Sequence, residues 1–327
     1  MKAMVLQAPG LPLTLETRET PQPGPGQVRL RVLACAVCRT DLHVLDGELP
    51  NLRYPIIPGH EVVGVVESVG AGVDTAMLGR RMGAAWLART CGQCTFCRAG
   101  QENLCSEALF TGYTLDGGFA THMLAHADYL FPLPAARAPA RMAPWLCAGL
   151  IGWRALRATG DAQRLGLYGF GSAARLLTQA CRHLNREVYA FTRTGDVAAQ
   201  AHALAMGATW AGNSSEPAPV PLDGAILFAP VGALVPSALG AVRPGGCVVC
   251  AGIHMSDIPA FPYRLLWGER SLSSVANLTR EDGREFLGKA HAWDLGADVR
   301  TYRLDDANRA LDDLRAGRIQ ATAVLLP

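Results

Sequence analysis

The amino-acid sequence predicts an α/β protein with a β-rich first part and a parallel, doubly wound sheet in its second part. In residues 1–143 glycine and proline recur at short intervals, and apolar Val28, Leu30 and Val32 alternate with Arg29 and Arg31. Such alternation is typical of half-buried strands. From residue 144 onwards short apolar runs alternate with helical patterns, which is typical of parallel βαβ units.

The second part of the chain carries four predicted strands with helices between them. The strands are expected at 165–168, 188–191, 225–228 and 247–250, and the helices at about 174–185, 198–206 and 234–242. Residues 212–221 are polar and proline-rich, and we expect them to form a loop.

Two domains are expected for 327 residues, because domains usually contain roughly 100–200 residues. After residue 274 the pattern becomes mixed again, and this last segment is expected to pack back on the first domain. The predicted domains are therefore 1–143 with 275–327, and 144–274.

The composition limits the possible partners and location. A net charge of +2 with no basic run gives no reason to expect nucleic acid or an anionic membrane as a partner. No apolar stretch approaches the ~20 residues of a membrane span. Pro9, Gly10 and Pro12 interrupt any signal-peptide core, so a cytoplasmic location is expected. In a reducing cytosol the ten cysteines are expected to serve as metal ligands or catalytic groups more often than as disulfides.

The most specific motif is a run of four cysteines, Cys91, Cys94, Cys97 and Cys105. Four thiolates at this spacing can close a tetrahedral shell around Zn²⁺, and a saturated shell leaves no position for substrate. The motif therefore predicts a structural zinc site. Four buried, unligated cysteines or an iron–sulfur cluster are the alternatives.

Three separate segments could form a second metal site. Cys38 precedes Arg39-Thr40-Asp41, His60 lies within Gly59-His60-Glu61, and Cys147 lies at the start of the α/β part. One histidine and two cysteines leave a fourth zinc position open, as a catalytic zinc requires. Taken singly, Cys147 could be a core cysteine and His60 a structural histidine.

Together these motifs resemble the zinc-containing alcohol dehydrogenases of the medium-chain dehydrogenase/reductase family. The matching residues fall in the family's order along nearly the whole chain: Cys38-x-Thr40-Asp41-x-His43, Gly59-His60-Glu61, the four cysteines, Cys147-Ala148-Gly149 and the glycine turn at 169–174. The resemblance implies a GroES-like catalytic domain combined with a Rossmann cofactor-binding domain.

The same resemblance implies roles for individual residues. Cys38, His60 and Cys147 would bind the catalytic zinc, with Glu61 beside the metal as an exchangeable ligand. Asp41 would orient His60 through its other ring nitrogen.

Further implied roles concern the proton and the cofactor phosphates. Thr40 would take the alcohol proton and pass it, through the cofactor ribose, towards His43 and solvent. Arg39 would lie near the cofactor pyrophosphate, or else be a solvated surface arginine.

A glycine turn predicts the nucleotide site. Gly169, Gly171, Ser172, Ala173 and Ala174 fit the pattern G-x-G-x-x-A between a buried strand and a helix. The first glycine makes the turn, the second admits the pyrophosphate, and a small third residue lets the helix pack on the strand. The helix N-terminus then offers N–H groups to the phosphates.

The end of the next strand favours NADP(H) over NAD(H). This strand ends at Thr192-Arg193 in place of the usual carboxylate, and both side chains can hydrogen-bond a 2′-phosphate. Asp196 lies close enough in sequence to bind a ribose hydroxyl instead. Ile253 and Arg280 are further candidate cofactor contacts.

Aromatic residues complete the predicted sites. Trp86 resembles the aromatic residue that lines the family's substrate pocket. Trp145 and Trp267 could line it as well, and core packing is the alternative for each tryptophan.

The expected activity is that of a zinc-dependent alcohol dehydrogenase or aldehyde reductase, which transfers a hydride between a small-molecule alcohol and NADP(H) or NAD(H). A zinc-independent quinone or enone reductase of the same fold is one alternative. A non-catalytic redox sensor that binds zinc and a dinucleotide is the other. The family resemblance further implies a homodimer or homotetramer.

Overall fold

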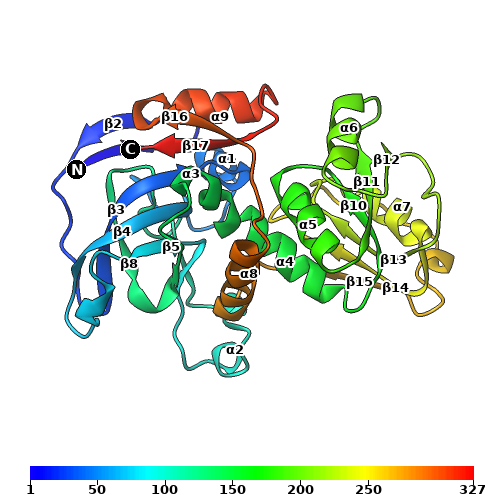
Figure 1. Cartoon of the computed structure of the whole chain (residues 1–327), viewed down its shortest axis with the longest axis horizontal. Coiled ribbons are helices and arrows are strands. Elements are labelled where there is room, and N and C mark those ends of the chain that lie inside the picture. Colours follow the sequence, from blue (N-terminus) through cyan, green and yellow to red (C-terminus); the bar gives the residue numbers. More distant parts are fainter. The chain divides into compact units, whose positions relative to one another are not determined.

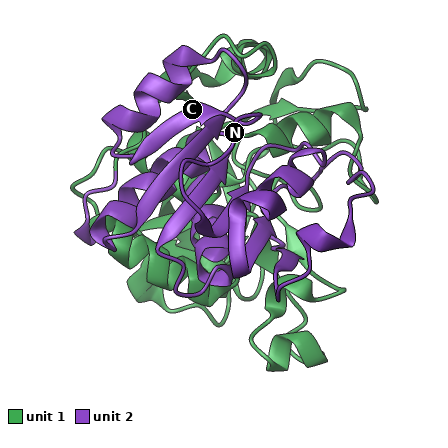
Figure 2. Cartoon of the chain, turned by 90° about the vertical axis from the view of Figure 1, so that its right-hand side faces the viewer, with its two compact units in different colours: residues 1–147, 278–291, 296–327 green, residues 148–277, 292–295 purple.

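The computed structural model describes residues 1–327 and forms two compact units, shown in green and purple in Figure 2. Unit 1 contains Met1–Cys147, Leu278–His291 and Gly296–Pro327, and unit 2 contains Ala148–Asn277 and Ala292–Leu295. The sequence predicts domain boundaries near residues 143 and 275. These boundaries stay a prediction.

Unit 1 is built on a seven-stranded sheet with the order β16-β17-β3-β4-β5-β9, in which β8 also pairs with β3. Its strands are β1 (Lys2–Val5), β2 (Thr14–Thr17), β3 (Gln27–Ala36), β4 (Glu61–Val69), β5 (Arg81–Ala84), β6 (Leu87–Arg89), β7 (Leu109–Phe110), β8 (His122–His126), β9 (Leu130–Pro132), β16 (Val299–Arg303) and β17 (Thr322–Leu326). Its helices are α1 (Arg39–Asp46), α2 (Thr95–Arg98), α3 (Pro139–Met142), most of α8 (Arg280–Ala292) and α9 (Ala307–Arg315).

Strand β3 is central to this sheet, as the alternation in its sequence predicts. Val28, Leu30 and Val32 are buried, whereas the arginines between them reach towards solvent. The C-terminal strand β17 pairs antiparallel with the end of β3, where Leu325 lies opposite Cys35. The last segment of the chain is thereby part of unit 1 (Figure 1).

Unit 2 contains a six-stranded parallel sheet with the order β12-β11-β10-β13-β14-β15. Its strands are β10 (Arg164–Tyr168), β11 (Glu187–Thr192), β12 (Trp210–Asn213), β13 (Leu222–Leu227), β14 (Val242–Cys250) and β15 (Ser271–Ser274), and its helices are α4 (Ala148–Ala158), α5 (Ser172–His183), α6 (Val197–Ala205) and α7 (Leu234–Ala241).

The strand order of unit 2 is that of a doubly wound sheet. From β10 the chain runs outwards through β11 to β12, and from β13 it runs the other way to β15. Right-handed connections therefore place α5 and α6 on one face and α7 on the other. The predicted α/β fold class is confirmed.

Two local predictions in unit 2 need correction. The helix expected from residue 174 begins at Ser172, directly after the glycine turn. The loop expected at 212–221 overlaps β12, because Gly212 and Asn213 pair with the end of β11. Glycine and asparagine disfavour strands on their own, so this edge strand depends on its neighbour. None of the helices combines the length and apolar character that crossing a lipid bilayer requires.

An ion pair attaches the start of α8 to the loop of the four cysteines. Glu102 accepts hydrogen bonds from the backbone N–H, the Nε and the Nη2 of Arg280, at 2.8, 3.0 and 2.8 Å. The Arg280 guanidinium also lies over the Tyr129 ring, 4.7 Å from its centroid. Because α8 begins where the chain re-enters unit 1 at Leu278, these contacts fix the position of the returning chain within that unit.

We expect Glu102→Gln to lower the free energy of unfolding at neutral pH by about 2 kcal/mol, since Glu102 is buried and its partner would keep an unpaired charge. Burial alone would raise the pKa of Glu102, but the hydrogen bonds from Arg280 bring it below the usual value of 4.5. A carboxylate with a depressed folded-state pKa stabilises above its unfolded pKa and loses that effect as pH falls.

Urea unfolding of both proteins between pH 7 and pH 3 measures this effect. The difference between wild type and variant should shrink below about pH 4.5. Glu281→Gln, which removes an exposed partner of Arg284, is the matched control and should change stability little. An equal loss in both variants would contradict the assignment.

Candidate functional site

The first candidate site starts at the N-terminus of α1. Cys38 is the N-cap residue of this helix, and its Sγ accepts a hydrogen bond from the Thr40 N–H at 3.3 Å. The Asp41 carboxylate in turn accepts the Cys38 N–H at 2.8 Å. This reciprocal capping box fixes the Cys38 side chain at the helix start.

Asp41 connects this helix start to the turn before β4. Its side chain is fully buried, and Oδ1 lies 3.2 Å from both the Gly59 N–H and the Nδ1 of His60. A carboxylate accepts only, so Nδ1 carries the proton and Nε2 is left as a ligand atom. A carboxylate on the other ring nitrogen is the usual partner that fixes the orientation of a metal-binding histidine.

The potential ligand atoms of Cys38, His60, Glu61 and Cys147 all lie within 4.8 Å of one another. The two sulfur atoms are 3.9 Å apart. That separation is close to the roughly 3.8 Å edge of a tetrahedron with Zn–S bonds of ~2.3 Å. Nε2 of His60 and Oε2 of Glu61 are buried without a hydrogen-bond partner. Buried polar atoms seldom lack partners, so these orphaned atoms fit a metal at their centre.

Burial and mutual contacts shift the pKa values of the titratable groups in this cluster. A hydrogen bond with Cys147 holds the pKa of the Cys38 thiol well below its usual value. Burial opposes a charged His60, yet the adjacent Asp41 carboxylate raises the pKa of the ring well above its usual value. Burial also raises the pKa of Glu61. A dense set of buried, mutually perturbed groups is typical of functional sites.

Aromatic rings cover one side of the cluster. Trp86 meets His60 edge-on, with ring centroids 5.0 Å apart, and stacks on Phe110 and Tyr113 at 5.3 and 5.5 Å. Trp86 thus lies against the ring of His60, and its role as a pocket-lining aromatic residue stays a prediction. Trp145 is completely buried and belongs to the core, whereas Trp267 is largely exposed.

The predicted proton-relay residues lie on α1. Thr40 is buried, and its side chain hydrogen-bonds the Cys38 thiol. His43 lies one turn further on, and its Nδ1 contacts the Glu48 carboxylate, a partner that the sequence motifs did not indicate. Arg39 is exposed at the helix start and makes no ion pair.

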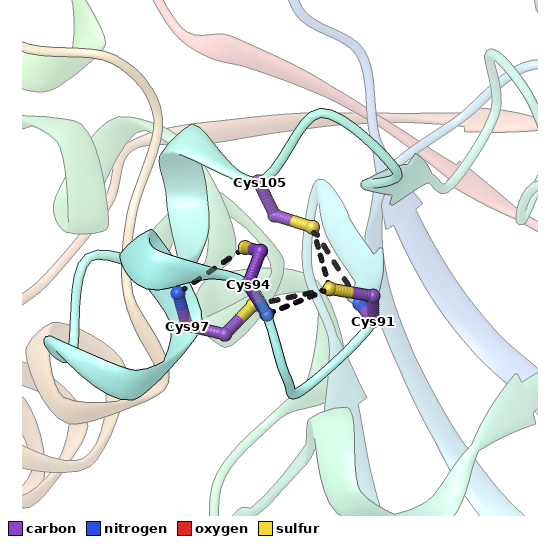
Figure 3. Close-up of side chains that lie close together, drawn as sticks. All are labelled: Cys91, Cys94, Cys97 and Cys105. Carbon is purple, nitrogen blue, oxygen red and sulfur yellow. Dashed lines mark hydrogen bonds between the residues drawn. The ribbon is translucent and has the colours of Figure 1, made fainter.

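The four cysteines converge on one point in unit 1 (Figure 3). The Sγ of Cys91 lies 3.9 Å from that of Cys97 and 3.6 Å from that of Cys105. These separations again match the edge of a zinc–thiolate tetrahedron, about 3.8 Å, and far exceed a disulfide bond of ~2.0 Å. All four thiols are free.

Backbone N–H groups point at these sulfur atoms. Cys94 N–H donates to the Sγ of Cys91 at 3.3 Å, and Cys97 N–H donates to the Sγ of Cys94 at 3.5 Å. Hydrogen bonds from the backbone of Gln93 and Cys94 lower the pKa of Cys91 to about 7, whereas burial raises that of Cys105 to about 11. The loop is therefore built to hold thiolate charge at its N-terminal end.

The predicted nucleotide turn lies in unit 2 between β10 and α5. Gly169 has a φ of +90°, and a Cβ there would approach the Ala229 nitrogen to 2.9 Å, so the turn requires glycine. A Cβ on Gly171 would meet nothing within 4 Å. The backbone before Ser172 therefore faces open space at the start of a twelve-residue helix, where a phosphate group can be accommodated.

At the end of β11, one of the two side chains expected to bind a 2′-phosphate already has partners within the protein. Thr192 is buried, and its hydroxyl donates to Gly212 O at 3.3 Å and accepts from Gln200 Nε2 at 3.1 Å. Arg193 is exposed and makes no ion pair. Asp196 caps α6 by accepting the Ala199 N–H at 3.0 Å.

The two remaining candidate cofactor contacts belong to other segments of the chain. Ile253 is an exposed residue in the loop after β14. The Arg280 side chain is bound to Glu102 within unit 1, which gives it a structural partner that the sequence pattern did not suggest.

Comparisons with known proteins identify the family. Residues 24–135 match the model of the alcohol dehydrogenase GroES-like domain. The whole chain is 44% identical, over 97% of the relative's length, to a probable alcohol dehydrogenase AdhA of Mycobacterium tuberculosis (strain CDC 1551 / Oshkosh). The chain therefore belongs to the zinc-containing alcohol dehydrogenases of the medium-chain dehydrogenase/reductase family, and it is an oxidoreductase of the class that acts on alcohols.

Solved structures agree with this family. The chain is similar over its whole length, with a TM-score of 0.90 and 25% identity, to 99% of a cobalt- and zinc-bound thermostable alcohol dehydrogenase from Pyrobaculum aerophilum. It is also similar over its whole length, with a TM-score of 0.89 and 25% identity, to 97% of an acetophenone reductase from Geotrichum candidum NBRC 4597 in complex with NAD.

We expect Gly59→Ala to damage the first cluster and the fold together. Gly59 has a φ of +96°, and a Cβ would approach Phe119 Cδ1 to 2.4 Å and Cys35 Sγ to 2.9 Å. The backbone must then move, and His60 follows in sequence. The free energy of unfolding should be about 2–4 kcal/mol lower than that of the wild type, and metal binding should be weaker.

Thermal unfolding and metal titration measure both effects. Gly72→Ala is the matched control, because Gly72 has a φ of +79° but open space around its Cβ position. It should lose only about 1 kcal/mol. Unchanged metal affinity in Gly59→Ala would show that the turn does not position His60.

Proposed function

We propose that the protein is a zinc-dependent alcohol dehydrogenase or aldehyde reductase, with one catalytic and one structural zinc ion per chain and a preference for NADP(H). The convergence of Cys38, His60 and Cys147 on one point, with an orphaned Nε2 on His60, carries this proposal. The cobalt and zinc named for the Pyrobaculum relative support it.

The catalytic site would be the cluster with mixed ligands. Two thiolates and one imidazole leave a tetrahedral position for substrate, with Glu61 at hand as a fourth group. The four-cysteine site would be structural, because its shell is complete. The close sulfur spacing there favours a single ion over a multi-iron cluster, whose thiolates bind different iron atoms.

When bound, zinc would act as a Lewis acid on the alcohol oxygen, and the nicotinamide would exchange a hydride with the carbinol carbon. The chain's own residues do the rest. Asp41 fixes the tautomer and orientation of His60. The Thr40 hydroxyl takes the alcohol proton, and His43 receives it on the way to solvent. A zinc-independent reductase or a mere binding protein would have no use for this combination.

Preference for NADP(H) follows from the charges at the end of β11. Arg193 is unpaired there and can bind a 2′-phosphate. Two nearby carboxylates are occupied, since Asp196 caps α6 and Glu216 binds the backbone and side chain of Asn213. Each still has lone pairs to spare, so Asp196 is the alternative partner, for a ribose hydroxyl as in NAD enzymes. Thr192 supports the strand end and leaves the phosphate to Arg193. Cytoplasmic location and a homodimeric or homotetrameric state stay predictions.

Metal analysis tests the two zinc sites separately. Wild-type protein should hold about two zinc ions per chain, and Cys147→Ser should hold about one and lose turnover while remaining folded. Cys97→Ser should lose the other ion and unfold at a lower temperature. Cys247→Ser, a half-buried cysteine outside both clusters, is the control and should keep both ions. Full activity of Cys147→Ser would overturn the proposed catalytic site.

Cofactor titration, followed by quenching of tryptophan emission, tests the preference. The wild type should bind NADPH more tightly than NADH. Arg193→Gln should weaken NADPH binding about 10–100-fold, because a hydrogen bond to a charged group is worth about 1.5–3 kcal/mol. NADH binding should not change. Arg264→Gln, another exposed arginine of unit 2, is the control. Tighter binding of NADH by the wild type would show that the protein is an NAD enzyme.

A further inference from the structure

A pocket of about 610 Å³ lies in unit 1, next to the loop of the four cysteines. Its lining includes Phe110 and Tyr113, whose ring centroids lie 5.3 and 5.5 Å from that of Trp86. Arg53 and Arg89 line it as well. Pockets that hold small organic ligands usually measure roughly 300–1,000 Å³, so this one has room for a compound with a single ring.

The charged side chains of this pocket are two arginines and one glutamate. Arg53 and Arg89 are exposed, and neither side chain forms an ion pair or a hydrogen bond within the protein. Glu107 is exposed and has no ionic partner either. Burial, and after it the positive charge of Arg89, lower the pKa of His126, as expected of an arginine without a counter-ion. Two positive charges against one negative charge leave an excess of one positive charge in the lining.

An alternative role for both arginines is to offset the charge of the four-cysteine site. Four thiolates and one Zn²⁺ together carry two negative charges, and Cys91 also lines the pocket. The sulfur atoms, however, accept hydrogen bonds from the backbone, such as the Cys94 N–H on the Sγ of Cys91 at 3.3 Å. No hydrogen bond joins either arginine to a sulfur atom, so the guanidinium N–H groups are available to a ligand.

The combination of guanidinium groups and aromatic rings selects a chemical class of ligand. A guanidinium can bind a carboxylate through two parallel hydrogen bonds. Aromatic side chains bind the ring of a ligand by stacking or by edge-to-face contact. A phosphate ion would make no use of the rings, and a metal cation would be repelled by the arginines. The lining therefore fits a compound that carries both a carboxylate and a ring.

We propose that this pocket is a binding site for an aromatic carboxylate. Arg53 and Arg89 bind the carboxylate, and the ligand ring packs against Phe110 and Tyr113. None of the potential ligands of the mixed-ligand cluster lines the pocket, so the two sites are separate. The inference does not depend on the proposed function, because binding here uses neither a hydride nor a nicotinamide.

Isothermal titration calorimetry of the zinc-loaded protein with benzoate, without cofactor, tests the site. The wild type should bind one benzoate per chain in this pocket. Arg53→Gln and Arg89→Gln should each weaken binding about tenfold or more, because a hydrogen bond to a charged group is lost. Arg80→Gln, an exposed arginine of unit 1 outside the pocket, is the matched control and should bind benzoate as the wild type does.

Three further probes test the chemical class of the ligand. Acetate carries the charge without the ring, benzamide carries the ring without the charge, and inorganic phosphate is an anion of another shape. Each should bind at least about tenfold more weakly than benzoate, since each lacks one of the two contacts. Phosphate or acetate that binds as tightly as benzoate would overturn the assignment to aromatic carboxylates.

Cys147→Ser distinguishes this pocket from the mixed-ligand cluster, because carboxylates also bind zinc. This variant should bind benzoate with the affinity of the wild type, and loss of binding would overturn the proposal. Unchanged binding in both Arg53→Gln and Arg89→Gln would overturn it as well. Zinc content and the unfolding temperature of these two variants should equal those of the wild type. Loss of zinc would instead assign the arginines to the four-cysteine site and refute the proposed binding site.

Discussion

The buried carboxylate of Asp41 is the constraint on which the mixed-ligand cluster depends. A charged group without exposure to water is costly unless it is fully hydrogen-bonded, and Asp41 meets that condition with three partners. Those partners are the Cys38 N–H, the Gly59 N–H and the ring of His60. They belong to the helix start and to the turn before β4. The free-energy cost of burying this carboxylate is offset only when the helix start and the turn lie together. The contacts that stabilise unit 1 here therefore also bring Cys38 and His60 close to each other.

The same pairing of histidine with carboxylate occurs twice, at different depths. His60 and Asp41 are both buried, which would suit a ring that stays in one tautomer as a metal ligand. His43 is shielded, but its partner Glu48 reaches solvent, which would suit the proton transfer proposed for His43. Thr40 and His43 lie three residues apart on α1 and so share a face of the helix, while Asp41 points inwards. On this short helix, Asp41 holds the cluster together, whereas Thr40 and His43 are the residues proposed to transfer the proton.

How much could be predicted from sequence depended on whether a contact is local. The four cysteines lie within fifteen residues, so their spacing alone indicated a metal shell. Cys38 and Cys147 are 109 residues apart, and only the resemblance to a family brought them together. The parallel sheet followed from alternating patterns, but β12 did not, because glycine and asparagine carry no strand signal. Glu48 and Glu102 were missed because their roles come from a loop geometry and from a contact across 178 residues.

The loop of four cysteines shows why such a distant contact matters. Three of its cysteines are only half-buried, and α2 within it is four residues long, so apolar burial contributes little to its order. A bound metal would have to supply most of the local stability, as in other small metal-binding loops. Glu102 lies inside this loop and holds the backbone and side chain of Arg280 at the start of α8. Order imposed by the metal would thereby reach the segment where the chain returns to unit 1. A structural ion at this position would stabilise more than its own loop, because Glu102 in that loop binds the start of α8.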